Sequence, residues 1–581
     1  MNRESLEKAL TASLTLMLGL ATLDLLLYIW VGTAALTVMA HAMTLWLVLR
    51  HRLIFDLVKK FGKKIINNKT YVIASDGDLM EGISHESMSL AGHLKLKDLI
   101  VFFDNNKISI DGSTSLSVSD NYKKRFESYG WNFIEINGHN EKQIDRAIKK
   151  AHKSKKPTLI SCKTIIGYGS PNKSGKSSSH GSPLGDDEIK LVRKKLKWSF
   201  PPFEIPDEIL NEWRQIGSKG ELLEKNWIDE LNKSKNETKE NFNKLNNKII
   251  RDELSNLFYK EKEKYFREKP SMATRQCSMK VIETLNNLLP NLIGGSADLS
   301  GSNNTKTSNS ITINSKNFAG NYIHFGVREH GMAAAMNGIS LYHNLIPYGG
   351  TFLIFSDYCK PAIRLSALMG LRVIYIFSHD SIGLGEDGPT HQPVEQLASL
   401  RAIPNLNVFR PADINETIEC WEASLNNEKG PSAIILSRQK LNYISKFPEK
   451  KNRCLMGAYE VNVSSHDYKV TILASGSEVE LALSTQTLLS NLGVESKVVS
   501  VPCQELFDKQ SDEYKNKILE NNLIVSLEAG TVSCWYKYLK QDDIAIGIDN
   551  FGKSAPYKEI YNEMNLSSNR IASIIQEKLR K

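Results

Sequence analysis

The chain has 581 residues, of which 41% are hydrophobic and 24% are charged, a balance typical of a globular enzyme with several domains. Its net charge of +9 is small for this length, so we expect acidic small molecules rather than nucleic acid as partners. Seven cysteines without a C-x-x-C pair predict reduced thiols and a cytoplasmic protein.

The first element is an apolar segment. Between Ala9 and Leu49 only Asp24 carries a full charge, and this run is long enough for one or two membrane spans. From Phe61 onward, the sequence pattern is that of the interior of an enzyme domain. We therefore interpret residues 1–55 as an anomalous leader that is not native enzyme sequence and arises from a frameshift or a wrong start. A membrane anchor is the weaker alternative.

Residues 56–200 alternate between strand-like and helix-like stretches, which indicates a parallel doubly wound sheet. The predicted strands are 71–75, 99–103, 131–136 and 158–163, and the predicted helices are 81–93, 120–129 and 141–154. Residues 201–270 are rich in Lys, Glu and Asn, which predicts a solvated, charged helical linker.

Two further α/β units follow the linker. Residues 271–447 contain predicted strands at 292–295, 372–377 and 432–436, and residues 455–581 contain predicted strands at 469–474, 496–501 and 522–527. We therefore expect an α/β fold of three domains with mostly parallel, doubly wound sheets.

Polar residues follow the first two predicted strands. Asp76 and Gly77 stand in YVIASDGDLMEG (71–82), and Asn106 stands in LIVFFDNNKISIDG (99–112), at strand ends where ligand sites of α/β sheets lie. A carboxylate, an amide oxygen and the backbone carbonyl near Ile108 suit Mg²⁺ or Ca²⁺ bridging a diphosphate. Asp and Asn also favour turns, so either residue alone decides nothing.

Glu329 stands in HFGVREHGMAAAMNG (324–338), where a strand-like start changes into a helix of small residues. Apolar walls would raise the pKa of its carboxyl, which could then share a proton with a ring nitrogen. The alternative is that Glu329 only caps the helix.

The segment 378–396, SHDSIGLGEDGPTHQPVEQ, gathers His379, Asp387 and His391 among Gly and Pro residues. A loop after a strand with these side chains predicts an active-site wall that transfers protons and recognises hydroxyls, although a polar surface turn would look similar. Arg275 and Arg438 each follow a Thr or Ser at an apparent element boundary, as expected for phosphate binding.

His180 lies in the Gly/Ser/Pro-rich stretch 167–185, which is too polar to form core. A long loop of this kind inside a domain is typically a lid or a binding loop. The alternative is an exposed histidine on a flexible loop.

These runs together resemble transketolase over residues 61–581. The first two carry the thiamine-diphosphate signature, a Gly-Asp-Gly run closed farther along by Asn, with Ser75 at the first Gly and Asn105 where many relatives have Asp. The resemblance implies the thiamine-diphosphate-binding fold twice, in a truncated diphosphate-binding domain (56–200) and a pyrimidine-binding domain (271–447), followed by a C-terminal transketolase-type domain (455–581).

The resemblance also implies an activity and site residues. The activity is transfer of a two-carbon ketol unit from a ketose phosphate to an aldose phosphate, in the pentose phosphate pathway, by a homodimer with the active site at the subunit interface. The implied metal ligands are Asp76, Asn106 and Ile108, and the implied catalytic residues are Glu329, His391 and His180. The implied cofactor-binding residues are Asp76, Gly77, Asn106, His180, Asp298, Glu329 and Phe355. The implied substrate-binding residues are His180, Arg275, Ser302, His379, Asp387, His391 and Arg438.

The amino-terminal part departs from the family. Transketolases have two more active-site histidines and a Gly-Pro-Leu-Gly-Gln-Gly run there, whereas Thr33 to Arg50 is apolar. We therefore expect little or no activity from this chain. The alternatives are another thiamine-diphosphate enzyme, such as a dihydroxyacetone synthase or a 1-deoxyxylulose-5-phosphate synthase, and an inactive membrane-tethered paralogue.

Overall fold

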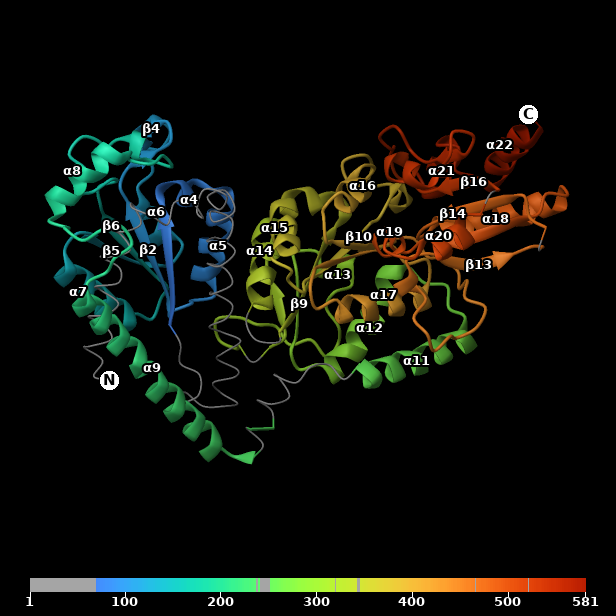
Figure 1. Ribbon diagram of the computed structural model, residues 1–581. Coiled ribbons are helices and arrows are strands. Elements are labelled where there is room, and N and C mark those ends of the chain that lie inside the picture. The colour runs from blue at the N-terminus through green and yellow to red at the C-terminus, as the bar shows by residue number, and fades with distance from the viewer. Residues whose placement is uncertain are drawn as a thin grey trace. The chain divides into compact units, whose positions relative to one another are not determined.

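The computed structural model describes residues 69–236, 239–240, 251–318, 320–341, 345–465, 467–520 and 522–580. The predicted leader, residues 1–55, lies outside these ranges. The chain forms two compact units, one with the first β-sheet and one with the second and third (Figure 1). Within the described ranges, no helix is both long enough and apolar enough to cross a membrane.

The first sheet has four parallel strands in the order β1-β2-β6-β5. Its strands are β1 (Thr70–Ser75), β2 (Leu99–Asn105), β5 (Asn132–Asn137) and β6 (Thr158–Lys163), and its main helices are α5 (Gly82–His93), α6 (Tyr122–Ser128) and α7 (Glu141–His152). The first five residues of β2 are all buried, because β2 is an inner strand covered on both faces. The parallel sheet predicted here is confirmed.

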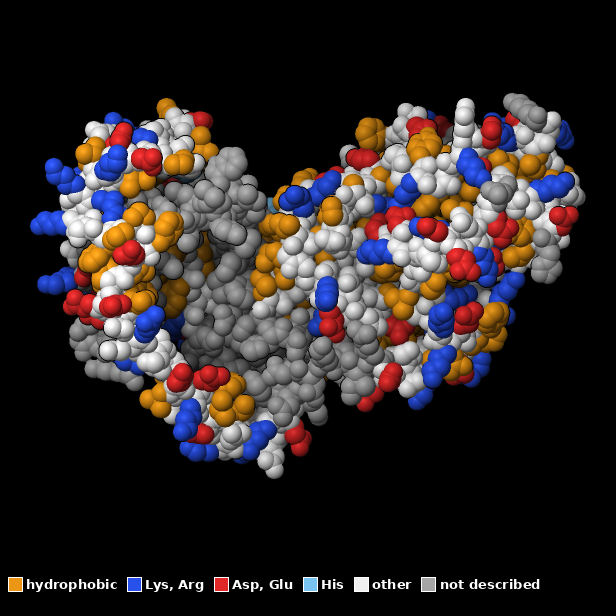
Figure 2. All heavy atoms as spheres, in the orientation of Figure 1, with side chains coloured by type: hydrophobic (Ala, Val, Ile, Leu, Met, Phe, Trp, Pro, Cys, Tyr) orange, Lys and Arg blue, Asp and Glu red, His pale blue; other side chains and the backbone are white. Residues whose placement is uncertain are grey.

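The charged segment 201–270 forms two described helices of different character. α9 (Asp207–Lys233) buries no residue, and Figure 2 shows hydrophobic side chains among charged ones along it. In contrast, α11 (Arg251–Glu268) buries Leu254, Phe258 and Tyr265 in the core of the second unit. The part of this segment that forms α11 is therefore not a solvated linker, because helical spacing gathers its few apolar residues on one face.

The second sheet has six parallel strands in the order β11-β12-β10-β9-β7-β8. They are β7 (Leu292–Ser296), β8 (Tyr322–His324), β9 (Ile346–Phe352), β10 (Ile374–Ser378), β11 (Asn407–Phe409) and β12 (Ser432–Leu436). The helices of this domain include α12 (Thr274–Leu288), α13 (Ser300–Asn303), α14 (Glu329–Ser340), α15 (Ser356–Leu368), α16 (Gln396–Arg401) and α17 (Ile414–Asn426).

The third sheet has the order β13-β15-β14-β16-β17, with only β13 antiparallel to its neighbour. The strands are β13 (Tyr459–Val463), β14 (Val470–Ala474), β15 (Ser496–Ser500), β16 (Leu523–Leu527) and β17 (Ile544–Ile546). The helices include α18 (Glu478–Asn491), α19 (Gln504–Asp508), α20 (Asp512–Leu519), α21 (Tyr557–Glu563) and α22 (Ser568–Arg580). The predicted α/β fold with mostly parallel sheets is confirmed, and all seven cysteines are free thiols.

Candidate active site

A capped turn carries Asp76 at the end of β1. Ser75 is the N-cap of the short helix α4 (Asp76–Met80) and donates to Asp78 Oδ2 from its backbone N–H at 2.6 Å and from its hydroxyl at 2.8 Å. The Asp78 N–H returns a longer hydrogen bond of 3.5 Å to Ser75 Oγ, which completes a capping box. The serine that departs from the Gly-Asp-Gly signature therefore fixes the backbone beside Asp76.

Asp76 and Asn106 lie together, as predicted from their strand ends. Asp76 Oδ2 accepts hydrogen bonds from the backbone N–H groups of Asn106 at 3.1 Å and of Lys107 at 3.0 Å. Asn106 Oδ1 accepts the N–H of Ile108 at 2.9 Å, and Asn106 Nδ2 donates to Asp104 Oδ2 at 3.3 Å. The three predicted metal ligands thus belong to one hydrogen-bonded cluster.

The chemistry of this cluster fits a divalent cation and a diphosphate. Asp76 is 2% exposed, and burial raises its pKa to about 6 although two backbone hydrogen bonds oppose the shift. A cation would favour the ionised carboxylate, and carboxylate, amide and carbonyl oxygens are the ligands that Mg²⁺ and Ca²⁺ prefer. A Cβ atom built on Gly77 has no described atom within 4 Å, so the turn is open to a ligand on that side.

The loop that carries His180 is anchored by Glu188 of α8 (Asp186–Leu196). The Glu188 carboxylate accepts the Ser170 hydroxyl, the Asn172 N–H at 2.9 Å and the Asn172 side-chain amide at 2.8 Å. These bonds, the Ser170 hydroxyl first, lower the pKa of Glu188 to about 2. His180 itself is exposed, and its N–H donates to Ser177 O at 2.8 Å.

A pocket of about 670 Å³ opens at the carboxyl ends of β5 and β6, in the same unit. Thr164, in its lining, donates its hydroxyl to Asp104, which also accepts the side-chain amide of Asn106. The pocket has the size of a small-molecule site. Its wall is therefore hydrogen-bonded to the cluster that holds Asp76 and Asn106.

In the second unit, Glu329 is the first residue of α14. It is 8% exposed, and burial raises the pKa of its carboxyl. The helix behind it is apolar, since Met332 to Met336 are at most 1% exposed. The direction of this pKa shift agrees with the one expected from the apolar sequence around Glu329.

Arg275 and Arg438 form the centre of a cationic cluster in this unit. Arg275 Nη1 donates to the backbone oxygen of Ser302 at 2.6 Å, and burial, then the charge of Arg438, lower the pKa of Arg275. Among the described residues, no carboxylate forms an ion pair with either guanidinium, and Arg275 Nε is buried without a hydrogen-bond partner. Like charges held together in this way favour an anionic ligand.

His379 belongs to the same cluster. It is 3% exposed and has a left-handed backbone with φ of 60°, while its Nδ1 lies 2.8 Å from Ser378 Oγ. Burial, followed by the charges of Arg275, Arg438 and His391, lowers its pKa to about 3. The ring is therefore neutral at physiological pH.

Aromatic rings adjoin His379. Phe352 stacks on the His379 ring at 3.7 Å and on Phe355 at 5.8 Å, and the His391 ring meets Phe355 edge-on at 5.7 Å. Tyr358 extends the stack from Phe355 at 5.9 Å. The sequence prediction named Phe355 but missed Phe352 and Tyr358, although all three stand at i, i+3 spacing in FLIFSDY (352–358).

The structure places the two remaining predicted site residues on the surface of this unit. Asp298 follows β7 with a left-handed φ of 62°, and Asp387 lies exposed in the loop 378–396. No hydrogen bond among the described residues connects either carboxylate to Arg275 or Arg438. The electrostatic influence of Asp298 is on His324 instead.

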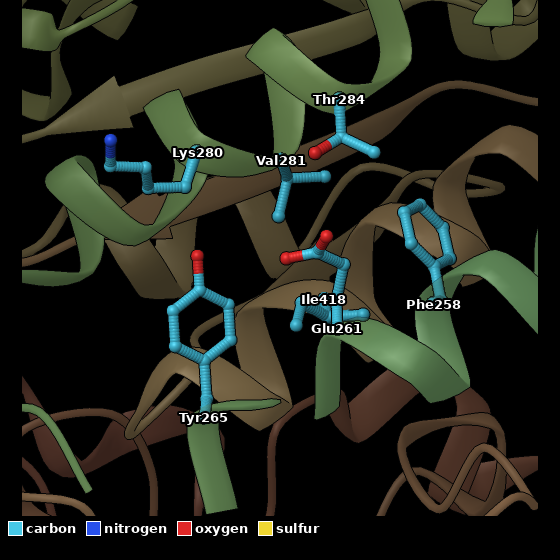
Figure 3. Close-up of a pocket in the computed structure, with 7 residues that line it drawn as sticks. All are labelled: Phe258, Glu261, Tyr265, Lys280, Val281, Thr284 and Ile418. Atoms are coloured by element: carbon cyan, nitrogen blue, oxygen red, sulfur yellow. The ribbon is translucent and has the colours of Figure 1, made fainter. Parts of the chain in front are cut away.

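A second pocket, shown in Figure 3, is lined by none of these residues. Side chains of α11, α12 and α17 line it, with a volume of about 10 Å³, and they are Phe258, Glu261, Tyr265, Lys280, Val281, Thr284 and Ile418. This space holds about one water molecule and is too small for a sugar phosphate.

Three family models match the sequence. Residues 39–254 match the thiamine diphosphate binding domain of transketolase, residues 270–443 match its pyrimidine binding domain, and residues 457–567 match a transketolase-like C-terminal domain. The first match begins inside the segment 1–55, and the assignment of that segment as a leader stays a prediction.

Curated and solved relatives agree with these matches. A transketolase of Sinorhizobium medicae is 44% identical over 526 residues, which cover 90% of this chain and 75% of the relative. The crystal structure of a transketolase from Campylobacter jejuni is similar with a TM-score of 0.83 at 37% identity, over 93% of this chain and 81% of that one. A Pichia stipitis transketolase in complex with sedoheptulose 7-phosphate has a TM-score of 0.82 at 34% identity, over 93% and 80% of the two chains.

Proposed function

Because the chain belongs to the transketolase family, we propose that it transfers a two-carbon ketol unit from a ketose phosphate to an aldose phosphate with thiamine diphosphate as cofactor. The observation that carries the proposal is the cationic cluster of Arg275, Arg438 and His379. A sugar phosphate dianion supplies the counter-charge that the described residues do not offer these guanidinium groups.

Different residues of the cluster contact different groups of the substrate. Arg275, held by the backbone oxygen of Ser302, and Arg438 neutralise the phosphate, and His379 lines the same site. Because the Ser378 hydroxyl donates to Asn303, His379 Nδ1 donates to Ser378 Oγ, and Nε2 of the neutral ring is left to accept a hydrogen bond from a substrate hydroxyl. Asp387, on the surface loop, recognises a sugar hydroxyl.

The first unit holds the cofactor. Asp76, Asn106 and the carbonyl of Ile108 bind Mg²⁺ or Ca²⁺, and Gly77 leaves room for the diphosphate. When bound, thiamine diphosphate supplies the carbanion chemistry that allows a C–C bond beside a carbonyl to break.

Residues of the second unit complete the site. Glu329 holds a proton against the aminopyrimidine ring, a role that its raised pKa supports, and Phe355 stacks against that ring. Asp298 lies near cofactor and substrate, while His180 and His391 take part close to the reacting atoms. We propose that two copies of the chain share each site, the first unit of one copy facing the second unit of the other.

Substrate binding is tested without the cofactor. Calorimetry with ribose 5-phosphate and with ribose measures whether binding depends on the phosphate. Arg275→Gln weakens binding by about 2 kcal/mol, close to thirtyfold, because a charge-assisted hydrogen bond is lost. The matched control is Lys280→Gln, which removes one positive charge from the same helix at the small pocket of Figure 3. Equal affinities for ribose and ribose 5-phosphate would refute the phosphate site.

Catalysis is tested with xylulose 5-phosphate and ribose 5-phosphate in the presence of thiamine diphosphate and Mg²⁺. We expect sedoheptulose 7-phosphate as product at a rate well below that of the Sinorhizobium medicae relative, because the apolar run Thr33 to Arg50 takes the place of the Gly-rich cofactor segment. Pyruvate as donor and formaldehyde as acceptor discriminate the two other thiamine-diphosphate activities. Near-normal turnover would contradict the expected loss but not the assigned reaction.

A further inference from the structure

The residue after His379 is tied to the third domain through a buried arginine. Asp380 is 2% exposed and Arg410 is fully buried, and Asp380 Oδ2 accepts Arg410 Nη2 at 2.7 Å and Nε at 3.1 Å. Arg410 follows β11 in the second sheet. The loop 378–396 is therefore bonded at its start to a residue that lies thirty positions away.

The same guanidinium group also forms hydrogen bonds with residues of the third domain. Arg410 Nη1 donates to the backbone oxygen of Ser475 at 2.9 Å and to the Glu478 carboxylate, and Nη2 donates to Ser477 Oγ at 3.1 Å. Gly476 lies directly against the side chain, because a Cβ there would be 2.7 Å from Arg410 Cγ. Only a glycine leaves room for this crossing.

The carboxylates around Arg410 are themselves held in place. Glu478 accepts the Ala529 N–H at 3.0 Å and the Tyr561 hydroxyl at 2.8 Å. Glu528, 3.9 Å from Arg410, makes two hydrogen bonds of 2.7 and 2.8 Å with Arg401. Removing the partner of any one of these buried charges is costly, so each carboxylate holds its arginine in place.

His379 needs such support, because a left-handed backbone is strained for a residue other than glycine. On its amino side, Ser378 Oγ donates to Asn303 Oδ1 at 2.6 Å, and its ring stacks on Phe352. On the carboxyl side of His379, Asp380 is held in place by its hydrogen bonds with Arg410.

We propose that Arg410 is a positioning residue for the sugar-phosphate site, which ties Asp380 to the third domain and thereby holds His379 in its strained backbone conformation beside Phe352. The inference rests on the proposed function. It gives the third domain, which contains none of the proposed site residues, a part in substrate binding.

The test measures the Kd for ribose 5-phosphate in the cofactor-free full chain, together with the Tm. Arg410→Lys keeps the charge but loses the paired bonds to Asp380, and we expect Kd to rise about tenfold. The matched control is Arg401→Lys, which breaks an equally buried pair with Glu528 in the same network but does not touch Asp380. This control lowers the Tm similarly and leaves Kd within about twofold of the parent chain.

A milder variant keeps the inference testable should Arg410→Lys fail to fold. Glu478→Gln preserves volume and leaves Arg410 in place with a weaker anchor, so Kd rises about threefold. Unchanged Kd in both folded variants, or in Glu478→Gln alone if the other does not fold, overturns the inference and leaves the proposed function standing. If the parent chain itself does not bind ribose 5-phosphate, the proposed function is overturned and the inference with it. An equal rise of Kd in Arg401→Lys reduces Arg410 to a general structural role.

Discussion

The imidazole ring of His379 stacks on the phenyl ring of Phe352, with centroids 3.7 Å apart and planes inclined by 29°. Phe352 ends β9, and His379 comes directly after β10. The two strands are parallel neighbours, with Ser378 opposite Phe352 in the register. The pairing of the strands therefore places a polar ring beside an aromatic one at the carboxyl edge of the sheet, where the cationic cluster lies.

Replacing Phe352 by Leu is expected to weaken ribose 5-phosphate binding by about 1 kcal/mol, roughly fivefold in Kd, because the stacking that orients His379 is lost. Calorimetry on the cofactor-free chain measures this change. The control is Phe258→Leu, in the core at α11, which destabilises the same unit without approaching the cluster. Equal Kd values for the Phe352 variant and the parent chain would show that the ring does not orient His379.

The neutral state of His379 makes the protein sensitive to acid. Burial, Arg275 and Arg438 lower its pKa to about 3, whereas the unfolded chain has the ordinary value of 6.5. Between these values the unfolded state binds more protons, so stability falls as pH falls below 6.5. At pH 5 the free energy of unfolding is lower by about 2 kcal/mol for this reason than it is well above pH 6.5.

His379→Asn removes this titration. Urea unfolding at pH 7.5 and at pH 5 should show that the variant loses less stability than the parent chain over the interval. His180→Asn serves as the control, since His180 is exposed on its loop. If the variant and the parent chain lose the same stability over this pH interval, His379 binds its proton equally well in the folded and the unfolded protein.

Glu329→Gln is expected to lower the residual turnover by about 100-fold or more, because an amide cannot exchange the proton that the carboxyl holds. Since Glu329 does not belong to the cationic cluster, the Kd for ribose 5-phosphate should stay unchanged. Steady-state kinetics and calorimetry on the same preparation separate the two quantities. A parallel rise in Kd would place Glu329 in substrate binding instead.

Asp76→Asn is expected to abolish the stabilisation that thiamine diphosphate and Mg²⁺ together give to the chain. Thermal unfolding with the cofactor, with and without a chelator, reports the Tm. Asp111→Asn is the matched control, because it makes the same charge change at an exposed position of the adjacent hairpin. If the Asp76 variant keeps the metal-dependent shift in Tm, the cation binds elsewhere.

Breaking the ion pair between Lys262 of α11 and Glu419 of α17 should strongly destabilise the second unit. The pair spans 2.9 Å, and its side chains are 2% and 1% exposed. Lys262→Met leaves a buried carboxylate without its cation and should cost about 3–5 kcal/mol, measured by urea unfolding. Lys260→Met is its control, on the same helix and unburied. A loss below 1 kcal/mol would show that water reaches Glu419 in the variant.

Continuous apolar or β-branched runs could be predicted as strands even where they are partly exposed, as in β5, whereas β9, which is buried throughout, could not, because Gly349 and Gly350 interrupt its run. The run Leu99 to Phe103 indicates a strand by itself, because an inner parallel strand is apolar throughout. Strands β8, β11 and β17 have three residues each and were not predicted. Such short runs have no period of their own, and only their pairing with neighbours defines them.

The same distinction applies to the site. Asp76 and Asn106 could be predicted as partners because parallel strands end at one edge of a sheet, so position along the chain already implies proximity. Arg410 could not, since its partners Asp380 and Glu478 are 30 and 68 residues away. Lys262 could not be predicted for a different reason, because a composition rich in Lys and Glu does not reveal which cation of α11 is buried.

The cap on α4 has a consequence for how a ligand would meet the first unit. With glycine at position 75 the helix would lack its capping hydroxyl, whose loss typically costs some tenths of a kcal/mol or more. Ser75 supplies that hydroxyl, so the corner between β1 and α4 is formed by the protein alone. A diphosphate arriving there would encounter a preorganised corner, and none of its binding free energy would go into ordering it.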